Sequence, residues 1–318
     1  MMYSIILPTH NRPELLKEAV GSVGAQRFDD WELIVVDDAS TEPLERDELD
    51  RLAGRPITLL RHEQSLGGAA AKSAGVRAAR GTYLAFLDDD DLLEPDYLEE
   101  AHKVLQSHSD LSALFMGVRW FGEKAVDGQR AQDDNLKRIK EASAPQCDQG
   151  GLCLFESEAL LRALLERIPM PFQRPVVSRE RFYKIGEYRP ECLLWDCDWA
   201  LRAVVHGPCA LLERGLYLQR ADRQGYSSRI ERALEQSRSA IEMKEYLLTR
   251  PLLGSRYGRN LKAALSRDWF SHAWQLQQAE RWSEADQALG QAVKYGVTPA
   301  IVKLYLAGLA KRLLHRRT

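Results

Sequence analysis

The stretch Tyr83-Leu84-Ala85-Phe86-Leu87-Asp88-Asp89-Asp90-Asp91 joins an unbroken apolar run to four consecutive carboxylates. Five apolar or aromatic residues after Gly81 predict a short strand buried on both faces, which is typical of parallel sheets covered by helices. The carboxylates follow at the strand's C-terminal end, the edge where open α/β sheets bind ligands. Because clustered carboxylates repel one another unless a cation lies among them, they indicate a divalent-ion site. Taken alone, they fit a solvated acidic turn before Pro95 equally well.

Strand-like and helix-like segments alternate around this stretch. Residues 3–7, 32–36 and 57–60 predict strands, and apolar residues recur at helical spacing over residues 15–23. This alternation predicts an α/β fold with a doubly wound, mostly parallel sheet flanked by helices. The second strand also ends in paired acids, Asp37 and Asp38. Two acidic strand ends at one edge favour a ligand site over an accidental turn.

The composition is that of an ordinary soluble protein. The chain has 318 residues, 45% hydrophobic and 28% charged, which leaves room for an α/β domain and an accessory region. A formal net charge of -2 gives no electrostatic case for nucleic acid as a partner. The N-terminus does not resemble a secretory signal, and no apolar run approaches the roughly 18 residues of a membrane span. We therefore expect a cytoplasmic protein, at most attached to the inner face of a membrane.

The cysteines do not form a recognisable framework. They are odd in number and contain no C-x-x-C pair, which argues against both a disulfide framework and a zinc site. We expect them to be reduced, mostly structural thiols. They are Cys147, Cys153, Cys192, Cys197 and Cys209.

Two common nucleotide-binding motifs are absent. Residues 67–75, Gly-Gly-Ala-Ala-Ala-Lys-Ser-Ala-Gly, begin a helix of small residues that can lie close to the sheet. Lys72 and Ser73 match the end of a P-loop, but Leu66 and Ala71 stand where that motif requires glycine. No G-x-G-x-x-G follows the first strand, so the dinucleotide fingerprint also fails.

Four segments resemble, in order and spacing, the motifs of family 2 glycosyltransferases with the GT-A fold. Together they cover about the first hundred residues. They are Leu7–Arg12, Val35–Ser40, Gly67–Gly75, and Gly81–Asp91 with Pro95.

The resemblance implies roles for individual residues. Thr9 and Asp38 would contact the base and ribose of a nucleotide, and Asp88-Asp89-Asp90 would be the family's D-x-D element. Asp90, together with Asp88, would then bind Mn²⁺ or Mg²⁺. Lys72 stands where the family usually has Arg, which keeps the positive charge but loses the bidentate fork. The implied nucleotide-sugar site consists of Pro8, Thr9, His10, Asn11, Arg12, Asp38, Gly67, Lys72, Asp88 and Asp89.

The middle of the chain is expected to supply the acceptor side. Residues 112–121 predict a strand, 123–150 a mobile loop, and 155–166 a helix. Residues 195–202 resemble the family's second active-site motif, in which Asp196 aligns with the catalytic base and Trp195 replaces a usual acid. A capped amphipathic helix with a solvated Asp196 is the alternative. Asp222 is a candidate extra metal ligand, since many relatives carry Arg-x-His there.

From about residue 228 the sequence contains helix formers and no strand pattern, and residues 280–292 look like one helical hairpin of tetratricopeptide type. Because one such unit cannot make a solenoid, we expect a helical cap on the catalytic domain. Residues 299–318 contain five Lys or Arg and no acid. They fit a membrane-surface helix, hence peripheral membrane contact, or a packed terminal helix with a basic tail. We expect three parts: a nucleotide-sugar-binding half of the GT-A domain at 1–110, an acceptor-binding half with the base at 111–227, and an all-helical C-terminal extension at 228–318.

The expected function is that of a metal-dependent inverting glycosyltransferase. It would move a sugar from a nucleotide diphosphate sugar, a UDP-sugar in the first instance, to a hydroxyl of a glycan, lipid-linked or other acceptor. Bacterial-type surface polysaccharide or glycoconjugate synthesis is the expected setting. A metal-dependent nucleotidyltransferase is one alternative. A catalytically silent nucleotide-sugar-binding or scaffolding module is another, suggested by the missing acid at Trp195.

Overall fold

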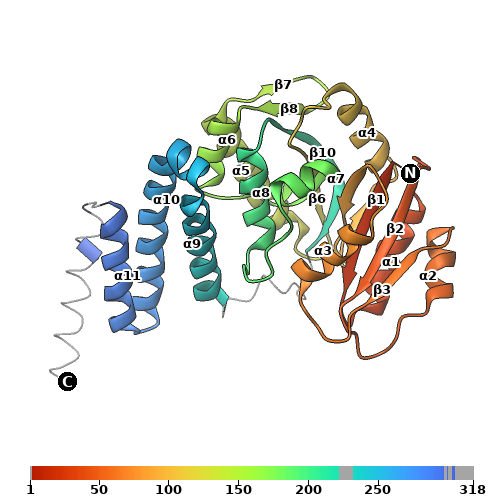
Figure 1. The fold of residues 1–318 in the computed structure, drawn as a ribbon, viewed down its shortest axis with the longest axis horizontal. Coiled ribbons are helices and arrows are strands. Elements are labelled where there is room, and N and C mark those ends of the chain that lie inside the picture. The colour runs from red at the N-terminus through yellow and green to blue at the C-terminus, as the bar shows by residue number, and fades with distance from the viewer. Residues whose placement is uncertain (1, 222–231, 297–298, 300–302, 305–318) are drawn as a thin grey trace. The chain divides into compact units, whose positions relative to one another are not determined.

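The apolar run before the four acids forms strand β4 (Tyr83–Phe86), which lies inside a ten-stranded sheet among the residues that the structure describes (Figure 1). The computed structural model describes residues 2–221, 232–296, 299 and 303–304. The chain divides into two compact units, one of residues 1–191 and 195–223 and the other of residues 192–194 and 224–318.

The sheet is mixed, and the strands from the first ninety residues of the chain form its parallel part. Its order is β3-β2-β1-β4-β9-β6-β10-β8-β7, with β5 paired to β10. Strands β3, β2, β1 and β4 pair in parallel. Strand β9 is antiparallel to both β4 and β6, and β10 is parallel to β6. The strands are β1 (Tyr3–Thr9), β2 (Trp31–Asp37), β3 (Thr58–Arg61), β4 (Tyr83–Phe86), β5 (Leu92–Leu93), β6 (Ala113–Phe121), β7 (Gln146–Cys147), β8 (Leu152–Phe155), β9 (Pro175–Ser178) and β10 (Cys209–Arg220).

Helices cover the sheet, as the buried strands require. The first unit contains α1 (Pro13–Gly24), α2 (Arg46–Ala53), α3 (Gly68–Ala78), α4 (Tyr97–Ser107), α5 (Ala125–Ser143), α6 (Ser157–Leu164), the 3-10 helix η1 (Met170–Gln173), α7 (Arg179–Ile185) and α8 (Trp195–Val205). The second contains α9 (Ala233–Thr249), α10 (Pro251–Gln278) and α11 (Trp282–Tyr295).

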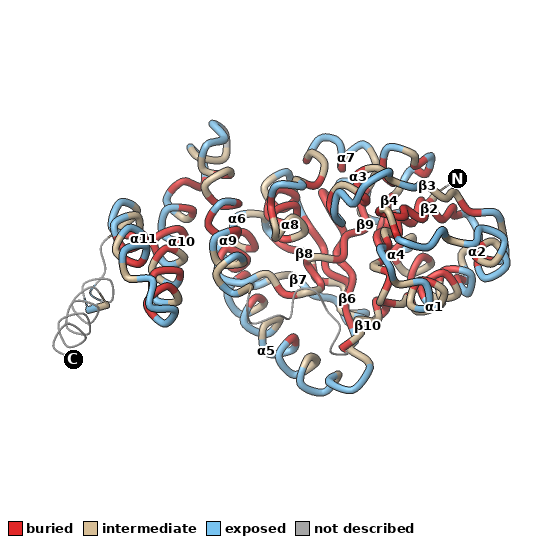
Figure 2. Tube along the Cα trace, turned by 90° about the horizontal axis from the view of Figure 1, so that it is seen from below, coloured by how far each residue is buried: buried red, intermediate tan, exposed pale blue. Residues whose placement is uncertain are grey.

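The two faces of β1 pack against different helices. Because side chains alternate along a strand, Ile5 and Leu7 join the core that also holds apolar residues of α1 and α4. Ile6 points to the other face, where it meets Gly75 of α3. Figure 2 shows β2 buried along its length. The predicted α/β fold with a mostly parallel, helix-flanked sheet and a helical C-terminal region is therefore confirmed.

The prediction of a mobile loop at residues 123–150 is wrong, because α5 occupies most of that segment. Its 19 residues include only three large apolar side chains, too few to reveal a helical period. Polar contacts attach it instead: Gln132 donates from Nε2 to the Val118 carbonyl at 2.6 Å and accepts from the Trp120 indole at 2.8 Å.

The prediction that all cysteines are reduced is also wrong. Cys147 and Cys153 form a disulfide, because the β7–β8 hairpin places them directly opposite each other. Cys192, Cys197 and Cys209 are buried and remain thiols.

In the second unit, α10 packs against both α9 and α11 around a small core that includes Ile241, Leu265 and Leu289. No helix among the described residues is long and apolar enough to cross a membrane. Asp222 and most of residues 299–318 lie outside the described part of the chain. The division of the first unit into 1–110 and 111–227 stays a prediction.

We predict that Gly75→Ala lowers the free energy of unfolding by about 1–3 kcal/mol, the usual cost of overpacking. A Cβ at Gly75 would lie 2.5 Å from Cγ2 of Ile6, so the helix must move away from the sheet. Urea unfolding followed by circular dichroism measures the effect. Gly21→Ala in α1 is the control, since its Cβ would meet nothing within 4 Å and should stabilise the protein slightly. Equal stability of the Gly75→Ala variant and the parent would contradict the close packing.

Candidate functional site

The four acids after β4 turn their carboxylates toward different partners. A backbone hydrogen bond from the Asp91 N–H to the Asp88 carbonyl, 3.1 Å long, closes the turn. Asp89 accepts from the Thr9 hydroxyl at 2.7 Å and from Arg12 at 3.1 Å. Arg12 also donates to Asp90 at 3.0 Å. The loop after β1 is therefore joined to the acidic turn.

Asp88 is held by two cations. The Lys72 ammonium lies 2.6 Å from one of its oxygens, and Arg174 lies 3.2 Å from the other. Burial raises the pKa of Asp88, but the charges of Lys72 and Arg174 outweigh it and hold the pKa well below its ordinary value. The carboxylate is thus ionised at neutral pH.

Asp91 lies beneath the turn and is fully buried. Its carboxylate accepts from the Tyr217 hydroxyl at 2.8 Å and from the Arg220 N–H at 2.9 Å, and Arg174 lies 3.5 Å away. Burial raises the pKa of Asp91 to about 7. The charge of Arg174 lowers this pKa, but the charges of Asp88 and Asp90 raise it again. Asp91 therefore anchors the turn and does not face a ligand.

The two residues predicted to bind metal are the more exposed members of the turn, although both are partly buried. The side chains of Asp88 and Asp90 are 30% and 24% exposed, against 9% for Asp89. Among the described residues, no three of these carboxylates come close enough to surround an ion by themselves. Mg²⁺ and similar ions are commonly held by one or two carboxylates together with substrate phosphates. The pair fits a shared site of that kind.

The loop after β1 also contacts the loop after β2. His10 Nδ1 lies 2.7 Å from the Asp38 carbonyl, and the side-chain oxygen of Asn11 accepts from the Thr41 N–H at 2.7 Å. Asn11 adopts a left-handed conformation with φ of 55°, which asparagine tolerates better than most residues. His10 and Asn11 are exposed.

Asp38 organises the segment that leads into α3. Its carboxylate accepts from His62 at 2.7 Å, Ser65 at 2.8 Å, and the N–H groups of Leu66 and Gly67 at 2.9 and 2.8 Å. Burial alone would raise the pKa of Asp38, but these hydrogen bonds lower it below the ordinary value. The chain itself thus uses the carboxylate that was predicted to contact a nucleotide, and that contact stays a prediction.

Trp195, which replaces a usual acid in the motif at residues 195–202, contacts Lys72, a role that the sequence did not predict. Its indole ring lies 4.7 Å from the Lys72 ammonium and packs edge-on against Tyr188 at 4.9 Å. A Cβ at Gly68 would lie 3.5 Å from the ring, an ordinary van der Waals distance, so the ring lies directly over the start of α3. A cation–π contact therefore covers Lys72 on one side while Asp88 binds it on the other.

The two acids of α8 have different environments. Asp198 is fully buried and pairs with Arg189 at 3.1 Å and Arg202 at 2.9 Å. Asp196 is partly exposed, and its carboxylate accepts from the N–H of Cys197 at 2.8 Å. Burial raises the pKa of Asp196, while the charges of Arg174 and Lys72 lower it in part. Asp196 is thus close to the acidic turn, whereas Asp198 has a structural role.

Arg174, Tyr217 and Arg220 are further members that the sequence did not reveal. They lie at the start of β9 and in β10, far along the chain from the acidic turn. Arg220 donates from Nε to the Asp90 carbonyl at 2.8 Å. The pattern Arg-Pro at 174–175 in front of a strand carries no functional signal, so only the fold identifies these residues. Several of the predicted residues contact one another: Thr9 and Arg12 bind Asp89, Arg12 also binds Asp90, and Lys72 binds Asp88. Pro8 lies next to Thr9 near the end of β1.

The sequence of this chain resembles a family model and several known proteins. Residues 4–166 match the model of the family described as glycosyl transferase family 2. The chain is 26% identical over 182 residues to the UDP-Glc:alpha-D-GlcNAc-diphosphoundecaprenol beta-1,3-glucosyltransferase WfgD of Escherichia coli, covering 57% of this chain and 67% of the relative. Three further curated relatives, 30% to 32% identical, are matched over only 15% to 43% of their own length.

Two solved structures share the fold. S. aureus TarS 1-349 in complex with UDP-GlcNAc gives a TM-score of 0.64 at 15% identity, covering 96% of this chain and 84% of that chain. The mannosyltransferase PcManGT from Pyrobaculum calidifontis, in complex with GDP-Man and Mn2+, gives 0.61 at 20% identity, covering 98% and 80%. The predicted GT-A fold is confirmed by these likenesses.

We predict that Asp38→Asn lowers the free energy of unfolding by about 2–3 kcal/mol at neutral pH, because hydrogen bonds to a charged group are lost. The folded pKa of Asp38 lies below its unfolded value, so its stabilisation is present above the unfolded value and is lost as pH falls through the folded one. The difference between variant and parent should therefore shrink in acid.

Urea unfolding at several pH values between about 7 and 3 checks this prediction. Asp134→Asn, an exposed acid on α5, is the matched control and should change little at any pH. A penalty for Asp38→Asn that is independent of pH would show that the charge of Asp38 does not matter.

Proposed function

Because the chain belongs to glycosyl transferase family 2, we propose that it transfers one sugar from a nucleotide diphosphate sugar to an acceptor hydroxyl, with inversion at the anomeric carbon. One observation carries the proposal: two partly exposed acids, Asp88 and Asp90, lie at the carboxyl edge of the sheet, and Asp196 of α8 interacts electrostatically with Arg174 and Lys72, the two cations that pair with Asp88. The first two suit a diphosphate with its cation, and the third suits an acceptor hydroxyl.

The donor end of the site is the acidic turn with Arg12 and Lys72. A divalent cation held by Asp88 and Asp90 would neutralise the negative charge that grows on the departing nucleoside diphosphate. Arg12 and Lys72 already lie against these carboxylates and can interact with phosphate oxygens beside them. Mn²⁺ or Mg²⁺ is the proposed ion, supported by the Mn2+ in the PcManGT complex.

The base and ribose are assigned to the two loops at the ends of β1 and β2. Pro8 and Thr9 end β1, and His10 and Asn11 lie on the loop between β1 and α1. Asp38 accepts hydrogen bonds from the N–H groups of Leu66 and Gly67, directly before α3. Uridine is the proposed base, because TarS was solved with UDP-GlcNAc and WfgD is named for UDP-Glc.

Asp196 is the proposed general base. The acceptor hydroxyl gives its proton to the Asp196 carboxylate while its oxygen bonds to the anomeric carbon, and the bond from that carbon to the diphosphate breaks. One such step inverts the configuration and needs a single carboxylate. The raised pKa of Asp196 makes its carboxylate a stronger base, whereas the two arginines that hold Asp198 exclude it from this role.

The acceptor is proposed to be a glycan or lipid-linked hydroxyl in surface polysaccharide or glycoconjugate synthesis. The support is the name of WfgD, whose acceptor is a sugar diphosphoundecaprenol. A membrane-associated acceptor of this kind is consistent with the basic residues of segment 299–318.

We predict that Asp196→Asn reduces the rate of sugar transfer by about 10²–10⁴-fold, the usual contribution of a positioned base, and leaves donor binding unchanged. Turnover with a UDP-sugar, calorimetry of UDP binding and the anomeric configuration of the product by NMR are the measurements. Glu180→Gln, an exposed acid on α7, is the control. Transfer at the parent rate, or a product that retains the donor configuration, would overturn the assignment. UDP-sugar binding by a parent that transfers no sugar to any acceptor would instead indicate a silent binding module.

We predict that Asp90→Asn weakens metal-supported UDP binding by at least about tenfold, because a carboxylate that helps to hold the cation becomes neutral. Calorimetric titration of UDP with Mn²⁺ and with EDTA measures it. The fold should survive, since the Asp90 side chain is partly exposed and its carboxylate pairs with Arg12, whose guanidinium is also bound by Asp89. Equal UDP binding by the parent with Mn²⁺ and with EDTA would contradict a metal at this turn.

A further inference from the structure

The register of three strands brings two cysteines and one glutamate to the same face of the sheet. Cys147 of β7 lies opposite Cys153 of β8, and Cys153 lies opposite Leu211 of β10. Side chains directly opposite each other share a face, and so do residues two apart on one strand. Glu213, two residues after Leu211, therefore joins the two cysteines.

The three side chains are close enough to share one ion. Their sulfur atoms and a carboxylate oxygen of Glu213 all lie within 4.8 Å of one another. In a tetrahedral zinc site, bonds of about 2.3 Å to sulfur and 2.0–2.2 Å to oxygen place neighbouring ligand atoms about 3.5–3.8 Å apart. Opening the disulfide and rotating the two cysteine side chains would bring the group to this spacing.

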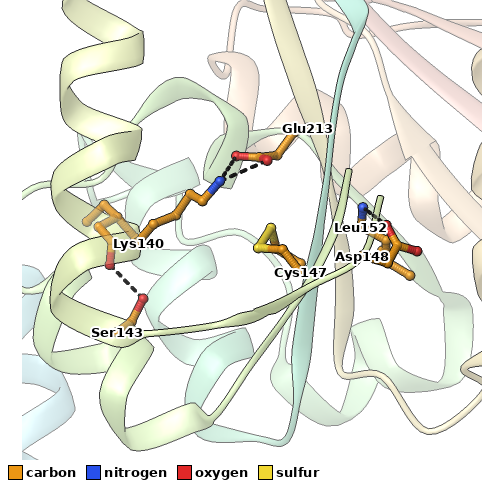
Figure 3. Close-up of a disulfide and its surroundings, with 8 residues drawn as sticks. Lys140, Ser143, Cys147, Asp148, Leu152 and Glu213 are labelled. Atoms are coloured by element: carbon orange, nitrogen blue, oxygen red, sulfur yellow. Dashed lines mark hydrogen bonds and ion pairs between the residues drawn. A yellow bond between two sulfur atoms is a disulfide. The ribbon is translucent and has the colours of Figure 1, made fainter. Parts of the chain in front are cut away.

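The surroundings allow an ion to enter. Lys140 of α5 donates to both oxygens of Glu213, at 2.9 and 3.0 Å, as Figure 3 shows. Both side chains are about one-third exposed, and ion pairs of this kind contribute only about 0–1 kcal/mol, so zinc can displace Lys140. A cavity of about 600 Å³ between α5 and the sheet is lined by Lys140, Cys147 and Glu213.

We propose that the reduced chain binds one zinc ion through Cys147, Cys153 and Glu213, with a fourth position open to water. Two thiolates favour Zn²⁺ over the harder Mg²⁺ and Mn²⁺, and three protein ligands with an open position are a known zinc arrangement. None of the three residues belongs to the candidate active site, so the proposal does not depend on the proposed function.

The disulfide and the zinc site exclude each other. A dithiol reduces the Cys147–Cys153 bond by supplying two electrons and two protons, and it is itself oxidised to a disulfide. Zinc then displaces the two thiol protons as each sulfur becomes a thiolate ligand. The oxidised chain has no thiolate at this place and should not bind the ion.

The test uses the full chain, reduced with a phosphine under anaerobic conditions and titrated with Zn²⁺ in competition with a chromogenic chelator. The reduced parent should bind one zinc per chain, and the disulfide form none. Cys147→Ser and Cys153→Ser should each weaken binding by at least about 100-fold, and Glu213→Gln by about 10–100-fold. Cys209→Ala is the matched control, because it removes a buried thiol elsewhere on β10 and should keep the parent affinity.

A second measurement does not depend on the folding of variants. Co²⁺ added to the reduced parent should give the intense ultraviolet absorption of thiolate-to-metal charge transfer, which Zn²⁺ should then abolish. Absence of that band, no zinc uptake by the reduced parent, or Ser variants that bind zinc as tightly as the parent would each overturn the site.

Discussion

A buried guanidinium makes the acidic turn possible. Arg174 is 4% exposed and lies between Asp88 and Asp91, with its plane over the ring of Tyr217 at 4.8 Å. Its Nε has no hydrogen-bond partner among the described residues, so its position is set by the acids and by Gln219. Losing one partner of a buried ion pair typically costs about 3–5 kcal/mol, because the other charge stays unpaired. The turn therefore depends on the residue directly before β9, the antiparallel strand beside β4.

Charge compensation also bears on the proposed reaction. Arg12, Lys72, Arg174 and Arg220 all contact the turn, so its acids are balanced by the protein before any ligand binds. If a diphosphate bound together with a divalent cation, the charged groups of the turn would change partners, and the net charge of the site would change little. In the proposed reaction Asp88 and Asp90 would hold the cation, and the ammonium of Lys72 could then interact with phosphate oxygens. Trp195 on the other side of Lys72 limits how far that ammonium can move.

The sequence predicted the parts of the site that are local. The buried run before Asp88, the end of β1 with its following loop at residues 8–12, and the start of α3 at residues 67–75 each carry their signal within a few residues. Arg174 and Tyr217 reach the site only through tertiary contacts, so no local pattern marks them. The motif at residues 195–202 marks the position of Trp195, but its contact with Lys72 depends on the fold. Helix α5 was missed because polar hydrogen bonds rather than an apolar stripe attach it. The disulfide was missed because a separation of 6 residues has no meaning until the β7–β8 hairpin sets the register.

The orientation of α8 explains why one of two similar acids is available for chemistry. Residues two apart on a helix point about 200° away from each other, so Asp196 and Asp198 cannot face the same surroundings. Arg202 holds Asp198 and also donates to the carbonyls of residues 185–187, which fixes the rotation of the helix. With Asp198 turned inward, Asp196 lies on another side of the helix, where it interacts electrostatically with Arg174 and Lys72. A structural ion pair therefore places the proposed base, and the residue before it, Trp195, lies against Lys72 for the same reason.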